Sequence, residues 1–211
     1  MSRPGTNAWY VRGERDPGSG LYEVHGYLGD RYPDGQVVDA SPPDLAGAQR
    51  IWSAATDDEG RPTLSVAREV SAAAADLWFV LIPDRPRQPT SIDLVAFDTE
   101  HAPPGRVLDN LAFTVLPVRS ADQVGAVRWA PPTGIVDQLY VDPGRRRQSL
   151  ATAIVYAASA YHQANGWPGA LRTDGRRTEL GQRFVVGLRH PSRIDPWTDQ
   201  AHPMDPDVAG R

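Results

Sequence analysis

Short apolar runs follow one another through the middle of the chain. β-Branched and aromatic residues dominate these runs, and each run is bounded by Pro, Asp or Gly, which is typical of strands. We expect strands at residues 77–82, 92–97, 111–118, 124–129 and 135–141. The turns at 119–122 and 130–133 are long enough for hairpins and too short for parallel crossovers. The pattern therefore predicts an antiparallel meander.

A helical period replaces this pattern over residues 149–164. Its apolar positions, at three- to four-residue spacing, are Leu150, Ile154, Ala157 or Ala158, and Tyr161. Asn165-Gly166 is a helix stop, and residues 170–173 are predicted to return as a strand parallel to 135–141. This β-α-β unit, joined to the meander, predicts a single α/β (α+β) domain with a mixed central sheet flanked by helices.

The two ends of the chain have weaker patterns. Residues 1–70 are rich in Gly, Pro and Asp and form an N-terminal extension or first part of the fold, with one predicted helix over 43–54. A last helix is expected over 178–188, with Thr178 as its N-cap. The proline-rich residues 189–211 are expected to be a flexible surface tail.

Composition excludes several classes of protein. The chain has no cysteine, so disulfides, thiolate metal sites and a cysteine nucleophile are excluded. The five histidines show no metal-ligand spacing, and we expect no metal. A net charge of −4 argues against a nucleic-acid partner. The N-terminus lacks the apolar core of a signal peptide, and no apolar run is long enough to span a membrane, so we expect a cytoplasmic protein.

The junction between residues 135–141 and the following helix has the features of an anion site. Asp142-Pro143-Gly144 ends the strand, and the helix begins within a few residues. Amides of roughly residues 146–152 have no intrahelical acceptor there, and the helix dipole adds partial positive charge. Three consecutive arginines, 145–147, lie in the same turn. The combination favours phosphate over other ligands, because guanidinium groups pair with phosphate oxygens.

The sequence VDPGRRRQSLA, residues 141–151, resembles the V-x-P-x-x-R-x-x-G-x-G/A signature of the GCN5-related N-acetyltransferases. Val141, Pro143, Arg146 and Ala151 occupy the expected positions, whereas Ser149 replaces a glycine. In that family the loop binds the pyrophosphate of acetyl-coenzyme A. The resemblance covers roughly residues 75–188, within a predicted acyl-coenzyme A-binding domain at 71–188. It implies the family's mixed sheet, including a bulge that splays the strand before the loop from its parallel neighbour.

The resemblance also implies which residues hold acetyl-coenzyme A, the acyl donor. They are Leu139, Tyr140, Val141, Arg146, Arg147, Gln148, Ser149, Leu150, Ala151 and Thr152. Asp137 is the candidate general base, since simple alternation places it on one face with Ile135, Leu139 and Val141. Desolvation among these apolar groups would raise its pKa into a useful range, and a structural carboxylate is the alternative.

The general acid is harder to assign. The family often has a tyrosine on the last helix, where this chain has Phe184; Tyr140, Tyr156 and Tyr161 are the other candidates, and helical spacing puts Tyr161 in the core. The resemblance implies acyl transfer from coenzyme A to a small-molecule or peptide amine by direct attack. The alternative is a weak or inactive relative that binds coenzyme A or acts as an interaction or regulatory module. Oligomeric state is open, with a homodimer as one option.

Overall fold

The computed structural model describes residues 7–15, 22–39, 47–57, 60–71, 76–186 and 193–200, which form mixed α/β structure with two larger mixed sheets. The first sheet has the order β3-β1-β2-β4-β5, with β1 and β3 parallel and the other pairs antiparallel. Its strands are β1 (Ala8–Arg15), β2 (Tyr22–Leu28), β3 (Val37–Asp39), β4 (Gln49–Thr56) and β5 (Pro62–Val66).

The second sheet has the order β11-β10-β9-β7-β6-β8. Its strands are β6 (Trp78–Pro83), β7 (Ile92–Phe97), β8 (Val107–Asp109), β9 (Gly125–Ala130), β10 (Ile135–Val141) and β11 (Arg172–Thr173). The pairs β6·β8 and β10·β11 are parallel, and the others are antiparallel. A small parallel pair joins β12 (Arg176–Arg177) to β13 (Asp199–Gln200).

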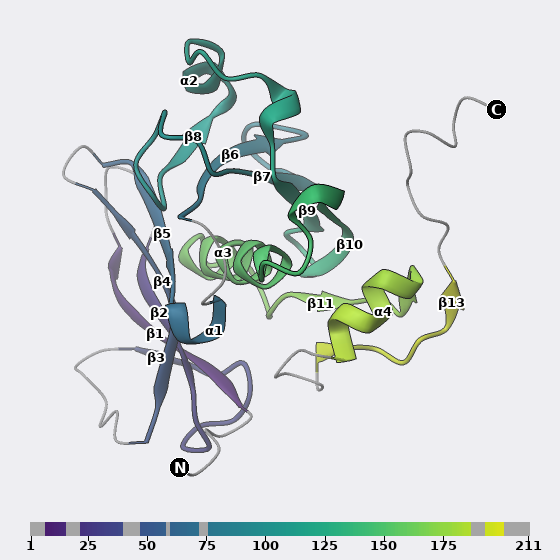
Figure 1. Ribbon diagram of the computed structural model, residues 1–211. Helices are drawn as coiled ribbons and strands as arrows, with labels where there is room; N and C mark the ends of the chain where they lie inside the picture. Colours follow the sequence, from purple (N-terminus) through teal and green to yellow (C-terminus); the bar gives the residue numbers. More distant parts are fainter. Residues whose placement is uncertain are drawn as a thin grey trace.

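Four α-helices accompany the sheets in the described residues: α1 (Arg68–Ser71), α2 (Asn110–Thr114), α3 (Leu150–Ala164) and α4 (Glu179–Val186). Helix α3 lies between the two larger sheets (Figure 1) and contacts β2, β4 and β5 on one side and β7, β9 and β10 on the other. Ala157, Ala158 and Ala160 are fully buried in it. Small side chains suit this helix because both sheets pack closely against it.

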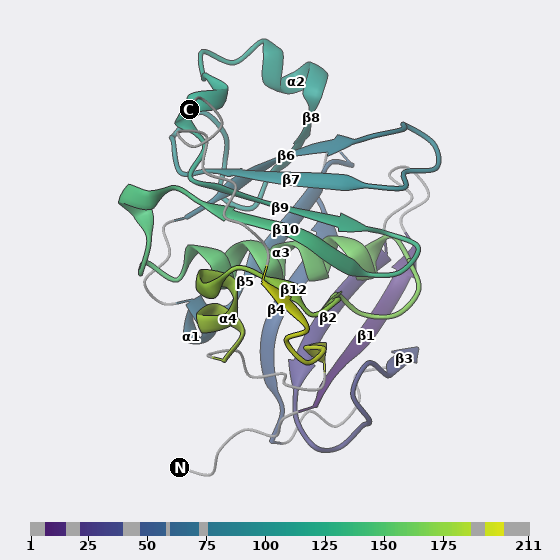
Figure 2. The ribbon, with the colours of Figure 1, turned by 90° about the vertical axis from the view of Figure 1, so that its right-hand side faces the viewer.

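Alternation along the strands of the second sheet directs one face toward α3. Val127 and Trp129 of β9 are fully buried, as are Ile92 and Leu94 of β7, whereas Arg128 lies on the opposite face. On that opposite face a smaller apolar cluster forms around Trp78 and Phe97, beneath α2. Figure 2 shows the strands β6, β7, β9 and β10 running side by side above α3.

Several predicted elements are confirmed. Strands form at 78–83, 92–97, 125–130 and 135–141, and the hairpin between β9 and β10 is antiparallel. Helix α3 is followed by β11, which is parallel to β10 as expected. Helix α4 begins after Thr178, whose hydroxyl accepts from the Gly181 amide at 3.0 Å, so the predicted N-cap is also confirmed.

Two predicted elements are wrong. The helix expected over 43–54 is strand β4 from Gln49 onward, while residues 40–46 lie outside the described part. Here a bulged pairing with β2 buries both Ile51 and Trp52, so helix-like apolar spacing arose inside a strand. The strand expected at 111–118 is instead α2 and a following turn, because Asp109 caps that helix by accepting from the Ala112 amide at 2.7 Å.

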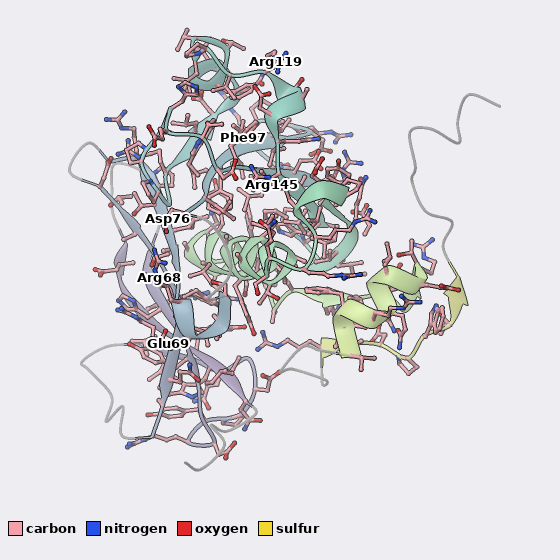
Figure 3. The ribbon with its side chains drawn as sticks, viewed as in Figure 1. Arg68, Glu69, Asp76, Phe97, Arg119 and Arg145 are labelled. Carbon is pink, nitrogen blue, oxygen red and sulfur yellow. The ribbon has the colours of Figure 1, made fainter. Side chains whose placement is uncertain are left out.

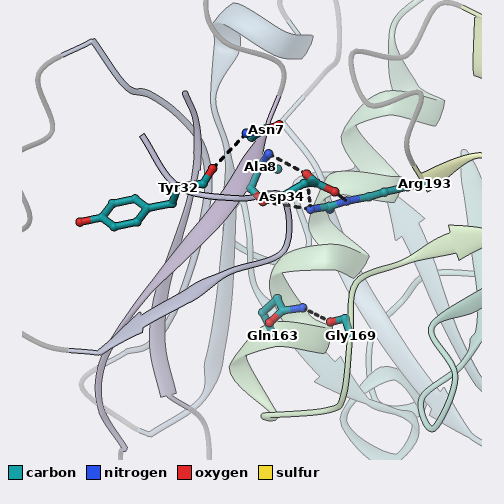
Figure 4. Close-up of polar contacts among 7 residues, drawn as sticks. All are labelled: Asn7, Ala8, Tyr32, Asp34, Gln163, Gly169 and Arg193. Atoms are coloured by element: carbon teal, nitrogen blue, oxygen red, sulfur yellow. Dashed lines mark hydrogen bonds and ion pairs between the residues drawn. The ribbon is translucent and has the colours of Figure 1, made fainter. Parts of the chain in front are cut away.

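The structures of the N-terminal and C-terminal segments also differ from expectation. Residues 1–70, predicted to hold one helix, carry the five-stranded sheet. Residues 193–200 pack against the rest of the chain, so the expectation of a tail with little structure is wrong for this segment. Arg193 pairs with Asp34 at 3.0 Å and donates to the Ala8 carbonyl at 3.1 Å (Figure 4). This ion pair fastens the C-terminal segment to the first sheet.

Candidate functional site

The loop between β10 and α3 is short and internally braced. The Asp142 carboxylate accepts from the Gly144 amide at 2.8 Å and caps a 3-10 turn over Pro143–Arg145. Arg146 is then extended, and α3 begins at Leu150 with Ser149 as its N-cap residue. The predicted strand, basic turn and helix are therefore all present at the predicted residues.

Two residues of this loop have a left-handed backbone. Within the described residues, Arg147 (φ 65°) and Ser149 (φ 58°) are the two non-glycine residues with positive φ. Each costs about 1–2 kcal/mol relative to a right-handed conformation. The Ser149 side chain makes no capping hydrogen bond that would offset this cost. Strained backbone of this kind concentrates at ligand-binding loops, and position 149 is where the resembled signature has glycine.

The strained loop presents a run of unpaired backbone donors. The first hydrogen bond into α3 is from the Ala153 amide to the Ser149 carbonyl, at 3.0 Å. Across the part of the chain that the structure describes, the amides of residues 146–152 donate to no protein acceptor. Such amides at a helix N-terminus, together with the helix dipole, bind anions.

The three arginines of the loop have different environments. Arg145 pairs with Asp98 at 2.8 Å. Arg146 and Arg147 are exposed and form no ion pair with any residue that the structure places. These two guanidinium groups are therefore available to an external anion, whereas that of Arg145 is engaged.

The strand leading into the loop has a β-bulge and a short pairing with its parallel neighbour. β10 pairs with β11 only through Ile135 and Val136, and its register with β9 shifts between Val136 and Gln138. Asp137 is the extra residue of this β-bulge. From Leu139 to Val141, no described strand pairs with β10 on its β11 side. A bulge commonly redirects a strand next to a functional site.

The bulge changes which side chains share a face. Val136, Leu139 and Val141 pack against the core around α3, while Tyr140 is half-buried opposite Ala126 on the other face. Asp137 is exposed, so the prediction that apolar side chains enclose it is wrong. Simple alternation fails because the bulge inserts one residue into the period of two.

The carboxyl of Asp137 is nevertheless perturbed. Partial desolvation raises its pKa above the ordinary value, and the positive charge of Arg128 opposes this rise. Arg128 itself pairs with Asp93 on the neighbouring strand through two hydrogen bonds, at 2.8 and 2.9 Å. Because Arg128 is already neutralised by Asp93, it stabilises the ionised form of Asp137 only in part. The direction of the shift is the one needed in a general base.

The tyrosines named as candidate acids are not equivalent. Tyr156 and Tyr161 are buried in α3, and burial raises the pKa of Tyr161 to about 12. Tyr161 packs edge-on against Trp167 at 5.8 Å, which confirms it as a core residue. Tyr140 is half-buried on β10, and Phe184 is half-buried on α4. Among these three tyrosines, Tyr140 is therefore the most accessible.

No metal centre is found among the residues that the structure describes, where no group of three or more His, Asp or Glu side chains is arranged for a metal ion. His162 is fully buried, and its Nε2 donates to the Pro168 carbonyl at 3.1 Å. His190 and His202 lie outside the described residues. No described helix is long and apolar enough to cross a membrane.

A separate cavity of about 680 Å³ lies between the two larger sheets, beside α1. Of the α3 residues only Ala153 lines it, and its polar wall includes Arg68, Glu69 and Asp76 (Figure 3). It contains none of the predicted coenzyme A residues. We therefore place the candidate site at the β10–α3 loop and along the edge of β10 at residues 139–141. Comparison of the chain with family models, with curated proteins and with solved structures found no match.

Proposed function

We propose that the protein transfers an acetyl or other acyl group from coenzyme A to an amine. The observation that carries the proposal is the pair of left-handed residues, Arg147 and Ser149, in a loop whose amides at 146–152 have no protein acceptor. The chain maintains this costly backbone at the turn where two exposed arginines are also free. A pyrophosphate satisfies all of these groups together, since it offers several acceptor oxygens and negative charge.

The edge of β10 at residues 139–141 extends this site along the sheet. Backbone groups on the edge after the bulge lack a strand partner among the described residues, and the pantetheine arm of coenzyme A carries two amides that pair with such groups. In this arrangement the phosphates bind at the helix N-terminus and the thioester lies along residues 139–141. The bulge at Asp137 would then lie close to the thioester.

The chemistry needs no covalent enzyme intermediate. A neutral amine attacks the thioester carbonyl carbon, a carbon–nitrogen bond forms, and the carbonyl oxygen becomes an oxyanion that backbone amides near Leu139–Val141 stabilise. The carbon–sulfur bond then breaks, and coenzyme A leaves as the thiolate. Asp137 accepts the proton of the attacking nitrogen directly or through a water, and Tyr140 is the candidate donor to the thiolate.

The second candidate is a protein that binds coenzyme A without turnover and acts as an interaction or regulatory module. It is favoured by Phe184, which cannot donate a proton, and by the burial of Tyr156 and Tyr161. Since coenzyme A thiolate is a fair leaving group, the absence of a strong acid weakens catalysis without abolishing it. The two candidates share the ligand and differ in chemistry.

Thermal melting with and without acetyl-coenzyme A tests ligand binding, which both candidate functions share. At 100 times the dissociation constant the ligand adds about 2.7 kcal/mol to stability. Release of free thiol with a panel of amines then tests transfer. A melting shift with thiol release supports the acyltransferase, and a shift without release over a broad panel supports the binding module. No shift at millimolar acetyl-coenzyme A would count against both.

A further inference from the structure

Asp98 lies outside the candidate loop and forms an ion pair with it from a fixed position. Asp98 directly follows β7, and its side chain is only 15% exposed. The preceding Phe97 stacks on Trp78 with ring centroids 4.6 Å apart. The indole of Trp78 in turn donates to the Thr99 carbonyl at 2.8 Å. Asp98 is therefore held between two residues that are themselves anchored to the sheet.

Arg145 connects this fixed point to the loop. Its Nη2 lies 2.8 Å from Oδ2 of Asp98, so the contact spans from the 3-10 turn after β10, past β9, to the end of β7. Figure 3 shows Arg145 below Phe97 at this end of the sheet. The backbone makes a parallel link, because the Asp142 amide donates to the Val124 carbonyl at 3.0 Å. Two independent contacts thus hold the turn that precedes Arg147 and Ser149.

We propose that Asp98 is a positioning residue for anion binding, acting through Arg145, and that Arg146 and Arg147 are the arginines that contact the ligand. This inference rests on the proposed function, since the anion is the pyrophosphate of coenzyme A. The Asp98–Arg145 pair has no net charge, so it contributes little attraction of its own. Its contribution is to hold the loop in the left-handed conformation that aims the free amides outward, which a ligand would otherwise have to impose.

The direction in which Asp98→Asn changes the affinity for coenzyme A separates this role from simple electrostatic repulsion. A carboxylate near an anion site repels the anion, so removal of its charge alone should tighten binding. If Asp98 positions the loop, Asp98→Asn should instead weaken coenzyme A binding, by about five-fold, as for the loss of a partly exposed ion pair. Arg145→Gln should weaken binding by a similar factor. The double variant should be no weaker than either single variant, because both remove the same contact.

The measurement is the dissociation constant of coenzyme A by calorimetry, with the full chain and each variant. Asp98→Glu, which keeps the charge, should recover part of the affinity. Asp122→Asn is the matched control, because Asp122 forms an ion pair of similar length with Arg119, at 3.0 Å, on the exposed surface. It should bind coenzyme A as the parent does. Tighter or equal binding in Asp98→Asn, or additive losses in the double variant, would overturn the inference.

A second measurement needs no ligand. Hydrogen exchange at the Ala153 amide, which donates to the Ser149 carbonyl, reports the conformation of the loop directly. Asp98→Asn should speed this exchange by more than its change in global stability accounts for, and unchanged exchange would refute positioning. Absence of coenzyme A binding by the parent chain would refute the proposed function instead. The two failures are therefore distinguishable.

Discussion

Replacing Ser149 with glycine should stabilise the protein, although glycine usually destabilises. Ser149 has a φ of 58°, and its side chain makes no capping hydrogen bond, so truncation removes strain and no capping contact. Glycine has no Cβ, so it adopts this left-handed conformation without the steric cost, which stabilises the folded state by about 1–2 kcal/mol. The greater freedom of glycine in the unfolded chain costs about 0.5–1 kcal/mol. We expect a net gain of about 0.5–1 kcal/mol in the free energy of unfolding.

For a chain of this length the gain corresponds to a rise in Tm of about 1–4 °C. Thermal and urea unfolding of the ligand-free protein measure it. Ala151→Gly is the matched control, because Ala151 lies two residues further along, inside α3, where glycine costs about 1 kcal/mol. The two substitutions should therefore change stability in opposite directions. A loss in Ser149→Gly equal to that in Ala151→Gly would show that residue 149 is not strained.

The same variant reports on the ligand. Coenzyme A affinity should be unchanged or higher in Ser149→Gly, because glycine permits closer approach of the phosphate to the backbone. A large loss of affinity with the expected gain in stability would show that the Ser149 hydroxyl itself contacts the phosphate. Stability and binding are thus measured on one substitution, and each has its own refuting result.

Three further predictions concern charge. Arg146→Ala should weaken coenzyme A binding by about 1.5–3 kcal/mol in calorimetry, the scale of lost charge-assisted hydrogen bonds, and equal affinity would remove Arg146 from the site. Asp137→Asn should lower kcat by on the order of 10²–10⁴ and leave cofactor affinity unchanged. The parent rate should rise with pH through an apparent pKa that the variant lacks, and this apparent pKa should stay fixed across acceptors of different basicity. Unchanged turnover would make Asp137 a structural carboxylate. Burial lowers the pKa of His162 from 6.5 to about 4, so between these pH values the unfolded chain binds a proton that the folded chain does not. The free energy of unfolding should therefore fall by roughly 3 kcal/mol as pH decreases from 6.5 to 4. His162→Leu should lack this pH-dependent component in urea unfolding, and an identical pH dependence of the variant and the parent would contradict the assignment.

The candidate loop was predictable because its signals are local. Pro143 and Gly144 end the strand, and the apolar spacing from Leu150 onward defines the helix, so the junction and its free amides follow from neighbouring residues. The left-handed backbone at Arg147 was not predictable, since arginine carries no preference for it. The turn before it is held by tertiary contacts such as the Arg145–Asp98 pair, which joins residues far apart in the sequence.

Elsewhere tertiary contacts overrode local patterns. Ile51 and Trp52 have the spacing of a helix face, yet pairing of β4 with β2 places them in a strand. The bulge at Asp137 has no marker such as glycine, and it alone reversed the predicted environment of that carboxylate. Asp98 was missed because nothing in its own neighbourhood indicates that Arg145 lies beside it.

The position of α3 between two sheets has a consequence for synthesis of the chain. The inner face of the first sheet, with Tyr10, Val24 and Trp52, is covered by a helix that is made only after residue 150. At usual elongation rates the ribosome needs on the order of ten seconds to proceed from β5 to the end of α3. During that interval the nascent sheet exposes an apolar surface whose own cover does not yet exist. The chain therefore depends on late completion of its core, and chaperone occupancy of the first 70 residues should end when α3 emerges.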